Sequence, residues 1–223
     1  MNVLVIAAHP DDEILGVGGT IAWHSERGDK VTILIVAEGA TSRLEGTDDD
    51  VNNLKKSAMD AASILGADVP LFFGLSDHRL DSIDFLDIVQ KIEAMAQNIR
   101  PEIIYTHHGS DLNLDHTIVH RATITAFRPL PESSVKKIYG FETLSSTEWS
   151  TPSIGPPFDP NYFIDISQTL DLKLAALKSY KNEMRKFPHP RSFEAVDHLA
   201  RLRGSRVGLS AAEAFEVILD INK

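Results

Sequence analysis

The sequence contains no cysteine. This absence excludes disulfides, thiolate metal ligands and a cysteine nucleophile. Any metal that the chain binds must therefore be held by histidine nitrogens and carboxylate oxygens.

Positive charge is also scarce. Lysine and arginine number 22 against 32 aspartates and glutamates, which gives a formal net charge of -10. Such a chain is repelled by phosphate backbones unless it is locally basic, so we expect no nucleic-acid partner. An acidic excess of this size is common in cytosolic enzymes, and by itself it identifies no substrate.

Long hydrophobic runs are missing as well. No stretch approaches the roughly 20 apolar residues that span a bilayer. The first residues, MNVLVIAAHPDDE, are apolar only briefly, carry no basic leader and run into three acidic residues, a pattern that does not suit a signal peptide. We therefore expect a cytoplasmic protein without a transmembrane segment.

The length and composition fit one folded unit. The chain has 223 residues, of which 43% are hydrophobic and 24% charged, close to the averages for globular proteins. A chain of this length leaves little room for a second independent core. We expect a single domain over residues 1–223, with no internal repeat and no low-complexity tail.

Apolar runs and helical patterns alternate along the first two thirds of the chain. Strands are predicted at residues 2–8, 31–37, 69–73, 103–106 and 136–143, and helices at residues 12–27, 51–65, 83–98 and 116–127. This alternation predicts an α/β fold, a Rossmann-like three-layer sandwich with a mostly parallel sheet. Such sheets place their sites at the carboxyl edge of the strands.

The last third of the chain is less regular. Residues 148–160 are rich in proline and predict an irregular connection to a short strand at residues 162–166. Helices are predicted at residues 170–181, 193–203 and 211–219.

Three glycines near the start, Gly16, Gly18 and Gly19, imitate part of a dinucleotide fingerprint. Their spacing from the first strand does not fit that motif, so we expect them to allow close packing of the first helix instead.

Two polar clusters follow predicted strands. His9, Asp11, Asp12 and Glu13 come after the first strand, and residues 106–116 (THHGSDLNLDH) come after the fourth. A hydrolytic zinc site needs three nitrogen or oxygen ligands and an open position for water. His9 and Asp12 can supply two of these ligands, and the second cluster can supply the third. Either cluster alone could instead be a solvated turn with a helix cap.

The sequence resembles the PIG-L/LmbE family of N-acetylglucosaminyl-type deacetylases. The family's opening motif AHPDDE stands at residues 8–13, and its second motif ends in Asp115-His116. The resemblance covers nearly the whole chain. It implies Zn²⁺ on His9, Asp12 and His116, with Asp11 as the general base, although such a ligand set also accepts Fe²⁺ and other divalent ions. Glu13 is expected to begin a helix.

The chain departs from the family at one position. Many members carry His-Pro-Asp-His, whereas this chain has Asn113-Leu114-Asp115-His116. Asn113 can donate a hydrogen bond to an oxyanion but has no titratable proton. We expect Asp11 to return its proton as the acid, with the loop histidines as alternatives. Asp115 is expected to orient a neighbouring group.

Candidate substrate-binding residues follow other strands or precede a helix. They are Arg43, Asp77, His108, His189 and Arg191, and His107 is a further candidate oxyanion partner. By the resemblance, Arg43 and Asp77 would bind sugar hydroxyls. Each of these residues could instead be an ordinary surface, turn or capping residue.

The sequence thus predicts a zinc-dependent hydrolase that removes an N-acyl group, usually acetyl, from an amino sugar or its conjugate. Two alternatives remain open. One is an amidase that acts on a non-sugar N-acyl metabolite, and the other is a metal- or sugar-binding protein that has lost catalysis. A homo-oligomer is plausible, but no apolar stripe identifies its interface.

Overall fold

A computed structural model describes residues 1–40 and 47–222. Its centre is a sheet with the strand order β3-β2-β1-β4-β5-β7-β6. The strands are β1 (Asn2–Ala7), β2 (Lys30–Ala37), β3 (Leu71–Leu75), β4 (Ile103–His107), β5 (Lys137–Phe141), β6 (Tyr162–Asp165) and β7 (Ala212–Asp220). Strands β1 to β5 are parallel, and β7 runs antiparallel to both of its neighbours. The predicted mostly parallel α/β fold is confirmed.

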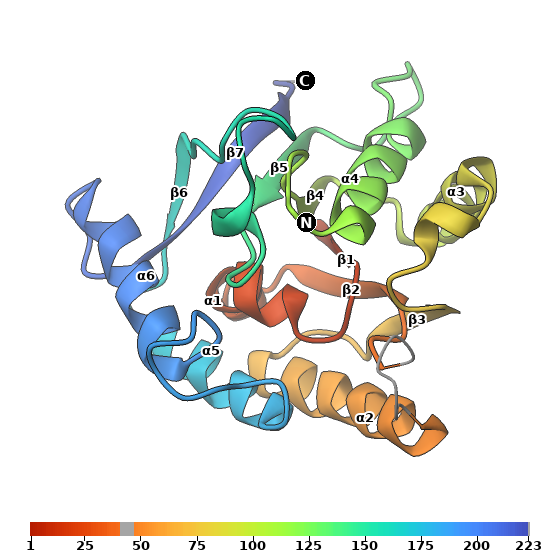
Figure 1. Ribbon diagram of the computed structural model, residues 1–223. Coiled ribbons are helices and arrows are strands. Elements are labelled where there is room, and N and C mark those ends of the chain that lie inside the picture. Colours follow the sequence, from red (N-terminus) through yellow and green to blue (C-terminus); the bar gives the residue numbers. More distant parts are fainter. Residues whose placement is uncertain (41–46, 223) are drawn as a thin grey trace.

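Helices cover both faces of this sheet (Figure 1). They are α1 (Asp12–Glu26), α2 (Asp48–Leu65), α3 (Phe85–Ile99), α4 (Leu114–Ala126), α5 (Leu170–Leu177) and α6 (Phe193–Ser205), with short 3₁₀ turns η1 (Leu80–Ser82), η2 (Thr147–Trp149) and η3 (Lys178–Tyr180). Helices α1, α2 and α5 lie on one face and α3 and α4 on the other. Among the described residues, no helix is long and apolar enough to cross a membrane.

The alternation of side chains along β1 explains the two cores. Val3 and Val5 pack into the cluster beneath α1, α2 and α5, whereas Leu4 and Ile6 pack into the cluster on the opposite face. A strand that is buried on both sides needs a continuous apolar run, as the sequence has here.

The glycines of α1 bring that helix close to the sheet, as predicted. A Cβ atom on Gly19 would lie 2.8 Å from Ile166, and one on Gly16 would collide with the ring of Phe141. Any larger residue at these two positions would push α1 away from β5 and from the chain after β6.

The helix predicted at residues 211–219 was wrong, because this segment forms strand β7. Its alanines and glutamates favour a helix in isolation. In the fold, however, the segment pairs with β5 on one side and β6 on the other, and its first four residues are buried. Sheet pairing and burial override the local preference.

Other boundaries moved by a few residues. The third strand begins at Leu71 rather than at residue 69. Helix α2 begins at Asp48, because Thr47 and Asp50 form a capping box that draws the aspartate run into the first turn.

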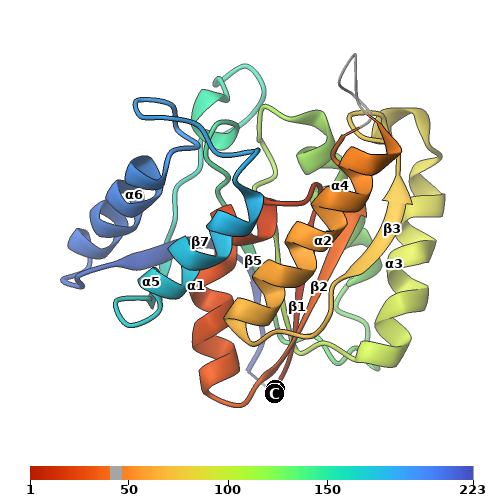
Figure 2. The same ribbon diagram turned by 90° about the horizontal axis from the view of Figure 1, so that it is seen from below.

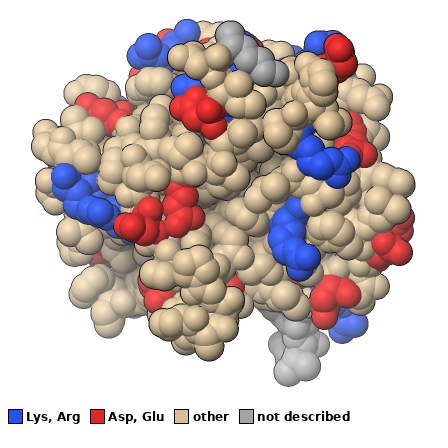
Figure 3. Space-filling model, turned by 90° about the horizontal axis from the view of Figure 1, so that it is seen from above, with Lys and Arg blue, Asp and Glu red and all other residues tan. Residues whose placement is uncertain are grey.

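The strands carry the loops that follow them to one edge of the sheet, which lies at the top of Figure 2. On the face in Figure 3, positive and negative side chains are interspersed, and neither gathers into a broad patch. His9 and Asp12 follow β1, and His116 follows β4, where these strands end at this edge of the sheet.

Candidate metal centre

The first two predicted ligands come from the turn between β1 and α1. The backbone amide of His9 donates to Asp12 Oδ2 at 2.9 Å, and His9 Nδ1 lies 3.2 Å from the same oxygen. Between them, Asp11 has φ 109° and ψ -30°, a conformation that side chains rarely adopt. Backbone strain of this kind concentrates at functional sites. Here the strained residue lies in the turn that brings His9 and Asp12 together.

The third predicted ligand comes from the start of α4, beyond β4. Asn113 caps this helix by accepting from the amide of Asp115 at 2.9 Å, which places His116 in the first turn. His116 Nε2 lies 3.2 Å from Asp12 Oδ2. Potential ligand atoms of His9, Asp12 and His116 all lie within 4.8 Å of one another, and the three residues are buried.

The donor atoms of this trio fit a divalent cation. Among the described residues, buried Asp12 Oδ1 has no hydrogen-bond partner, and neither do the two buried ring nitrogens of His116. The nitrogens approach carboxylates at 3.2 Å, but neither contact is aligned as a hydrogen bond. Buried polar atoms left in this state are costly unless a ligand satisfies them. Two imidazoles and a carboxylate suit zinc or ferrous iron.

Two carboxylates orient His9 from its outer side. His9 Nε2 lies 3.1 Å from Asp115 Oδ2 and 3.2 Å from Asp77 Oδ1. Burial opposes a charge on the ring, yet hydrogen bonds to Asp115 and Asp12 raise the pKa of His9 to about 10. If a metal ion displaced the proton from Nδ1 while the carboxylates held the one on Nε2, the free lone pair of His9 would lie on Nδ1, next to Asp12.

A second possible ligand group shares His9 and adds Asp77 and His78. In this group His9 Nε2 lies 3.2 Å from Asp77 Oδ1, but the same nitrogen also lies 3.1 Å from Asp115 Oδ2, which is outside the group. His78 is also exposed, whereas all three members of the first group are buried. The geometry therefore favours the group of His9, Asp12 and His116.

Asp111 contacts His116 on the side of the ring opposite Asp12, a role that the sequence analysis did not predict. Its Oδ1 lies 3.2 Å from His116 Nδ1, and it accepts hydrogen bonds from Ser146, Thr147 and the amide of Asn113. Burial favours the neutral acid, but His116 and the hydroxyl donors lower the pKa of Asp111 to about 2. Its position two residues before the Asn113 cap was the available signal.

His107 is fixed as a neutral ring beside the centre. Its Nε2 accepts from the amide of Ala8 at 2.9 Å, and its Nδ1 faces Thr143 Oγ1 at 3.3 Å. Burial, with the nearby His116, holds the pKa of His107 well below its usual value. The ring stacks on His116 with centroids 3.9 Å apart. His107 thus packs against the candidate ligand His116, and both of its own ring nitrogens are engaged.

Asp11 is a buried carboxyl with a near-neutral pKa. Burial raises the pKa of Asp11 to about 7, although Arg191, whose Nη1 donates to Oδ2 at 2.7 Å, opposes the shift. Its Oδ1 has no partner among the described residues. A carboxyl in this state can both accept and return a proton near neutral pH.

Glu13 lies in the first turn of α1, near the predicted helix start, and it is buried. It accepts from the amide of Asp11 at 3.0 Å and from the hydroxyl of Tyr180 at 2.6 Å. Burial raises the pKa of Glu13 to about 8. Glu13 therefore braces the strained turn that presents Asp11.

A cavity of about 110 Å³ opens beside the centre. Its lining consists of His9, Pro10, Asp11, Gly39, Asp77, His78, Asn113, Glu183 and Arg191. Four predicted catalytic or substrate-binding residues are thus in one place: Asp11, Asp77, Asn113 and Arg191. Because the carbonyl oxygen of Asn113 caps α4, its side-chain NH₂ group is the part left to donate.

The other predicted substrate residues lie elsewhere. His189 accepts from the amide of Arg191 at 3.0 Å, so it shapes the segment that carries Arg191. His108 is buried, with Nδ1 at 2.6 Å from Glu216 and Nε2 at 3.2 Å from the carbonyl of Pro156. A sugar could use His108 only if these contacts broke. Arg43 lies outside the described residues.

Comparison of this sequence with known proteins assigns the chain to a family. Residues 4–127 match the model of the PIG-L family, described as GlcNAc-PI de-N-acetylase. The uncharacterized deacetylase YaiS of Escherichia coli is 32% identical over 187 residues, covering 81% of this chain and 91% of that protein. The probable N-acetyl-alpha-D-glucosaminyl L-malate deacetylase 2 of Bacillus cereus is 29% identical, covering 82% and 83%.

Two further proteins show the breadth of the likeness. The 4-oxalmesaconate hydratase of Pseudomonas putida is 28% identical, covering 79% of this chain and 72% of that protein. The solved structure of N,N'-diacetylchitobiose deacetylase from Pyrococcus horikoshii matches with a TM-score of 0.77 at 20% identity, covering 97% and 83%. At that identity, the structural likeness shows the fold.

Proposed function

The chain belongs to the PIG-L family, and from this we propose that it is a metal-dependent deacetylase that removes the N-acetyl group from an amino sugar or its conjugate. The observation that carries the proposal is the convergence of His9, Asp12 and His116 at one buried point, with polar atoms left unsatisfied. The relatives support deacetylation as the reaction, since several are named as deacetylases of N-acetylglucosamine conjugates.

The proposed metal is Zn²⁺, held by His9, Asp12 and His116. When bound, a divalent ion of this kind acidifies water and polarises a carbonyl group. Asp77 and Asp115 keep the His9 ring oriented, and Asp111 does the same for His116. Such outer contacts fix the ligands in the geometry that binding requires.

Asp11 is the proposed general base and then the acid. Its unpartnered Oδ1 is available to take a proton from the attacking water. The same carboxyl then returns the proton to the departing amine, a reversal that a pKa near neutrality allows. Arg191 holds Oδ2 at 2.7 Å during this cycle, so that Oδ1 stays directed at the reacting atoms.

Asn113 takes the place of the histidine that many family members carry. Asn113 lines the cavity, and its NH₂ group would donate a hydrogen bond to the oxyanion of the tetrahedral intermediate. Asp77 and Arg191 also line the cavity and would contact sugar hydroxyls. Binding of the ring there would fix the amide beside Asp11.

The test is release of acetate from N-acetylglucosamine conjugates. Protein stripped of metal should be inactive, zinc should restore acetate release, and an Asp11→Asn variant should stay inactive while it still binds zinc. Asp87→Asn, which makes the same change on the exposed side of α3, is the matched control and should remain active. Zinc binding without release from any N-acetyl sugar would contradict the proposal.

The substrate panel should also include compounds that are not sugars. One relative is named as a 4-oxalmesaconate hydratase, so likeness in sequence does not by itself fix the substrate class. Turnover of a non-sugar amide, or of an unsaturated acid, with no turnover of any amino sugar would reassign the substrate class while keeping the metal centre.

A further inference from the structure

A groove adjoins the catalytic cavity. It lies between residues 50–60 of α2 and the segment from η3 to Glu183, and its volume is about 460 Å³. Glu183 lines both the groove and the catalytic cavity, so the two spaces are adjacent on either side of this residue. A substrate larger than one sugar ring would reach the groove by extending past Glu183.

The floor of the groove is tied to the catalytic turn. Tyr180 lines the groove and is buried, and its hydroxyl donates to Glu13 at 2.6 Å. Glu13 in turn holds the amide of Asp11. The groove is thus a fixed extension of the site and not a separate surface feature.

The groove has a polar wall, which argues against a lipid tail. The α2 side presents Asp50, Asn53, Lys56, Ser57 and Asp60, and the facing segment presents Lys178, Ser179, Lys181 and Asn182. No exposed aromatic ring lines it. An alkyl chain would remove these polar groups from water without giving them partners.

Some charged side chains of the groove have partners within the protein, and others do not. Asp50 caps α2 through Thr47, and Asp60 pairs with Lys56 at 3.4 Å. Glu183 is buried at the junction with the cavity. In contrast, Lys178 and Lys181 are exposed, and their side chains make no ion pair or hydrogen bond with any other residue that the structure describes. Two cations are left to face a ligand, on a chain whose net charge is -10.

We propose that this groove binds the aglycone of the substrate and that Lys178 and Lys181 select an aglycone with an anionic group, a carboxylate or a phosphate. The inference rests on the proposed deacetylase function, because it concerns the part of the substrate beyond the amino sugar. Lys178 and Lys181 make no contact with the metal ligands or with Asp11, so they should govern specificity and leave the chemical step unchanged.

The experiment compares two doubly substituted proteins on four substrates. Lys178→Glu with Lys181→Glu reverses the two groove charges. Lys30→Glu with Lys91→Glu makes the same change of net charge at exposed positions, at the start of β2 and on α3. The substrates are N-acetylglucosaminyl L-malate, N-acetylglucosamine 1-phosphate, the neutral N,N'-diacetylchitobiose and free N-acetylglucosamine.

For the groove variant, KM for the malate conjugate, the phosphate or both should rise about tenfold with kcat unchanged, as expected for loss of exposed charge contacts. KM for the two neutral substrates should change less than about twofold. The control pair should leave all four values near those of the wild type. The anion whose KM rises identifies the anionic group that the groove prefers.

An equal change for charged and neutral substrates, or no change for either anion, would overturn the proposal. Binding gives a second measurement that does not depend on turnover. In an Asp11→Asn background, the Kd of the preferred anionic conjugate should weaken about tenfold with the groove substitutions. An unchanged Kd would reject the groove proposal even if deacetylation is confirmed, whereas a weakened Kd without acetate release would reject only the proposed reaction.

Discussion

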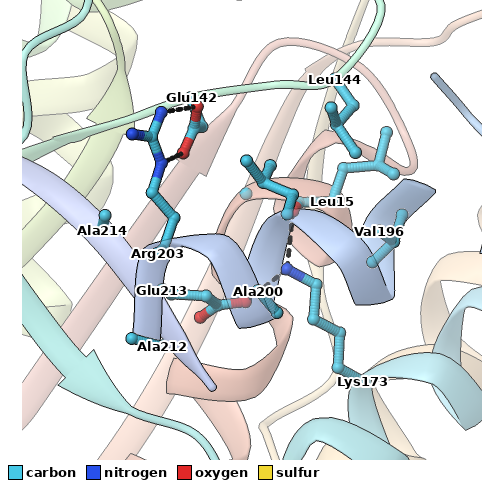
Figure 4. A pocket seen from close by; sticks show the side chains of 12 residues that line it. Leu15, Glu142, Leu144, Lys173, Val196, Ala200, Arg203, Ala212, Glu213 and Ala214 are labelled. Atoms are coloured by element: carbon cyan, nitrogen blue, oxygen red, sulfur yellow. Dashed lines mark hydrogen bonds and ion pairs between the residues drawn. The ribbon is translucent and has the colours of Figure 1, made fainter. Parts of the chain in front are cut away.

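Helix α1 carries two buried clusters of charge, and they are built differently. At its start, Asp11 and Asp12 and the neighbouring His116 of α4 have buried atoms without hydrogen-bond partners among the described residues. At its middle, Glu213 accepts from Lys173 Nζ at 2.6 Å and from the amides of Gly19 and Thr20 at 2.9 and 2.7 Å. Lys173 also donates to the carbonyl of Leu15 at 2.8 Å, as Figure 4 shows.

The second cluster satisfies itself. The space enclosed around Lys173 and Glu213 is only about 10 Å³, and the adjacent pair of Arg203 and Glu142 is closed by two hydrogen bonds. Such a cluster joins α5 and β7 to α1, and all of its charged groups are engaged. The comparison teaches that buried charge by itself does not mark a site, whereas buried charge that the fold leaves unsatisfied does.

The largest expected effect is on catalysis at the first cluster. Asp11→Asn should lower the rate of deacetylation by about 10³-fold, or about 4 kcal/mol of transition-state stabilisation, because the base is lost. Zinc content should not fall. Steady-state kinetics and metal analysis on the same preparation check both statements. If Asp11→Asn kept a tenth of the wild-type rate, Asp11 would not be the general base.

The next effect is on stability at the second cluster. Lys173→Met should lower the free energy of unfolding by about 3 kcal/mol, because Glu213 is left buried and charged without its cation. Replacing both partners, with Lys173→Met and Glu213→Gln, should recover part of the loss. Urea unfolding measures both. An unchanged free energy of unfolding for Lys173→Met would show that the ion pair of Lys173 and Glu213 does not stabilise the fold.

A smaller effect is expected from the contacts that orient His9. Asp115→Asn should weaken zinc binding about tenfold to 100-fold, since its Oδ2 contact to His9 Nε2 loses its negative charge. The amide keeps an oxygen for the bond that Oδ1 accepts from Leu80. Competition with a chromogenic chelator gives the affinity. Asp81→Asn, in the exposed part of η1, serves as the matched control.

The smallest effect concerns His108 and Glu216, a satisfied pair away from the cavity. Burial opposes the charge on His108, but Glu216 raises the pKa of His108, and His108 in turn lowers the pKa of Glu216. The raised histidine pKa contributes stability below its unfolded value of 6.5 and loses that contribution as the pH rises through the folded value. The lowered glutamate pKa contributes above its unfolded value of 4.5 and loses that contribution as the pH falls through the folded value.

Glu216→Gln should therefore destabilise the protein by about 1 kcal/mol between the two unfolded values, and by less at pH 9. Thermal unfolding of wild type and variant across this pH range measures the difference. A difference that grew steadily toward pH 9 would have the wrong sign for a charged His108.

The sequence predicted the first cluster better than the second. The residues of the metal centre directly follow strands, so the edge of a parallel sheet brings them together once the strand order is known. Glu213 stood in a segment whose composition favours a helix, and the predicted helix at residues 211–219 was wrong for that reason. Its pairing with Lys173 depends on β7 joining the sheet between β5 and β6, which no local pattern encodes.

The supporting residues of the site were also beyond local patterns. Asp111 and Glu183 reach their positions through loops whose course cannot be derived from the spacing of residues in the sequence. His108 was a candidate because it lies in the polar cluster after the fourth predicted strand, but in the structure it contacts Glu216 of β7. In contrast, Asp77 and Arg191 were placed near the site because one follows a strand and the other precedes a helix. Their contact with substrate stays a prediction.

The most direct test of the metal centre is calorimetric titration of zinc into metal-free wild-type protein and into His116→Ala and His78→Ala variants. The two substitutions separate the two possible ligand groups that share His9. The predicted result is one zinc per chain for the wild type and for His78→Ala, and loss of that binding for His116→Ala. Binding that survived His116→Ala and vanished in His78→Ala would contradict the assignment of the centre to His9, Asp12 and His116.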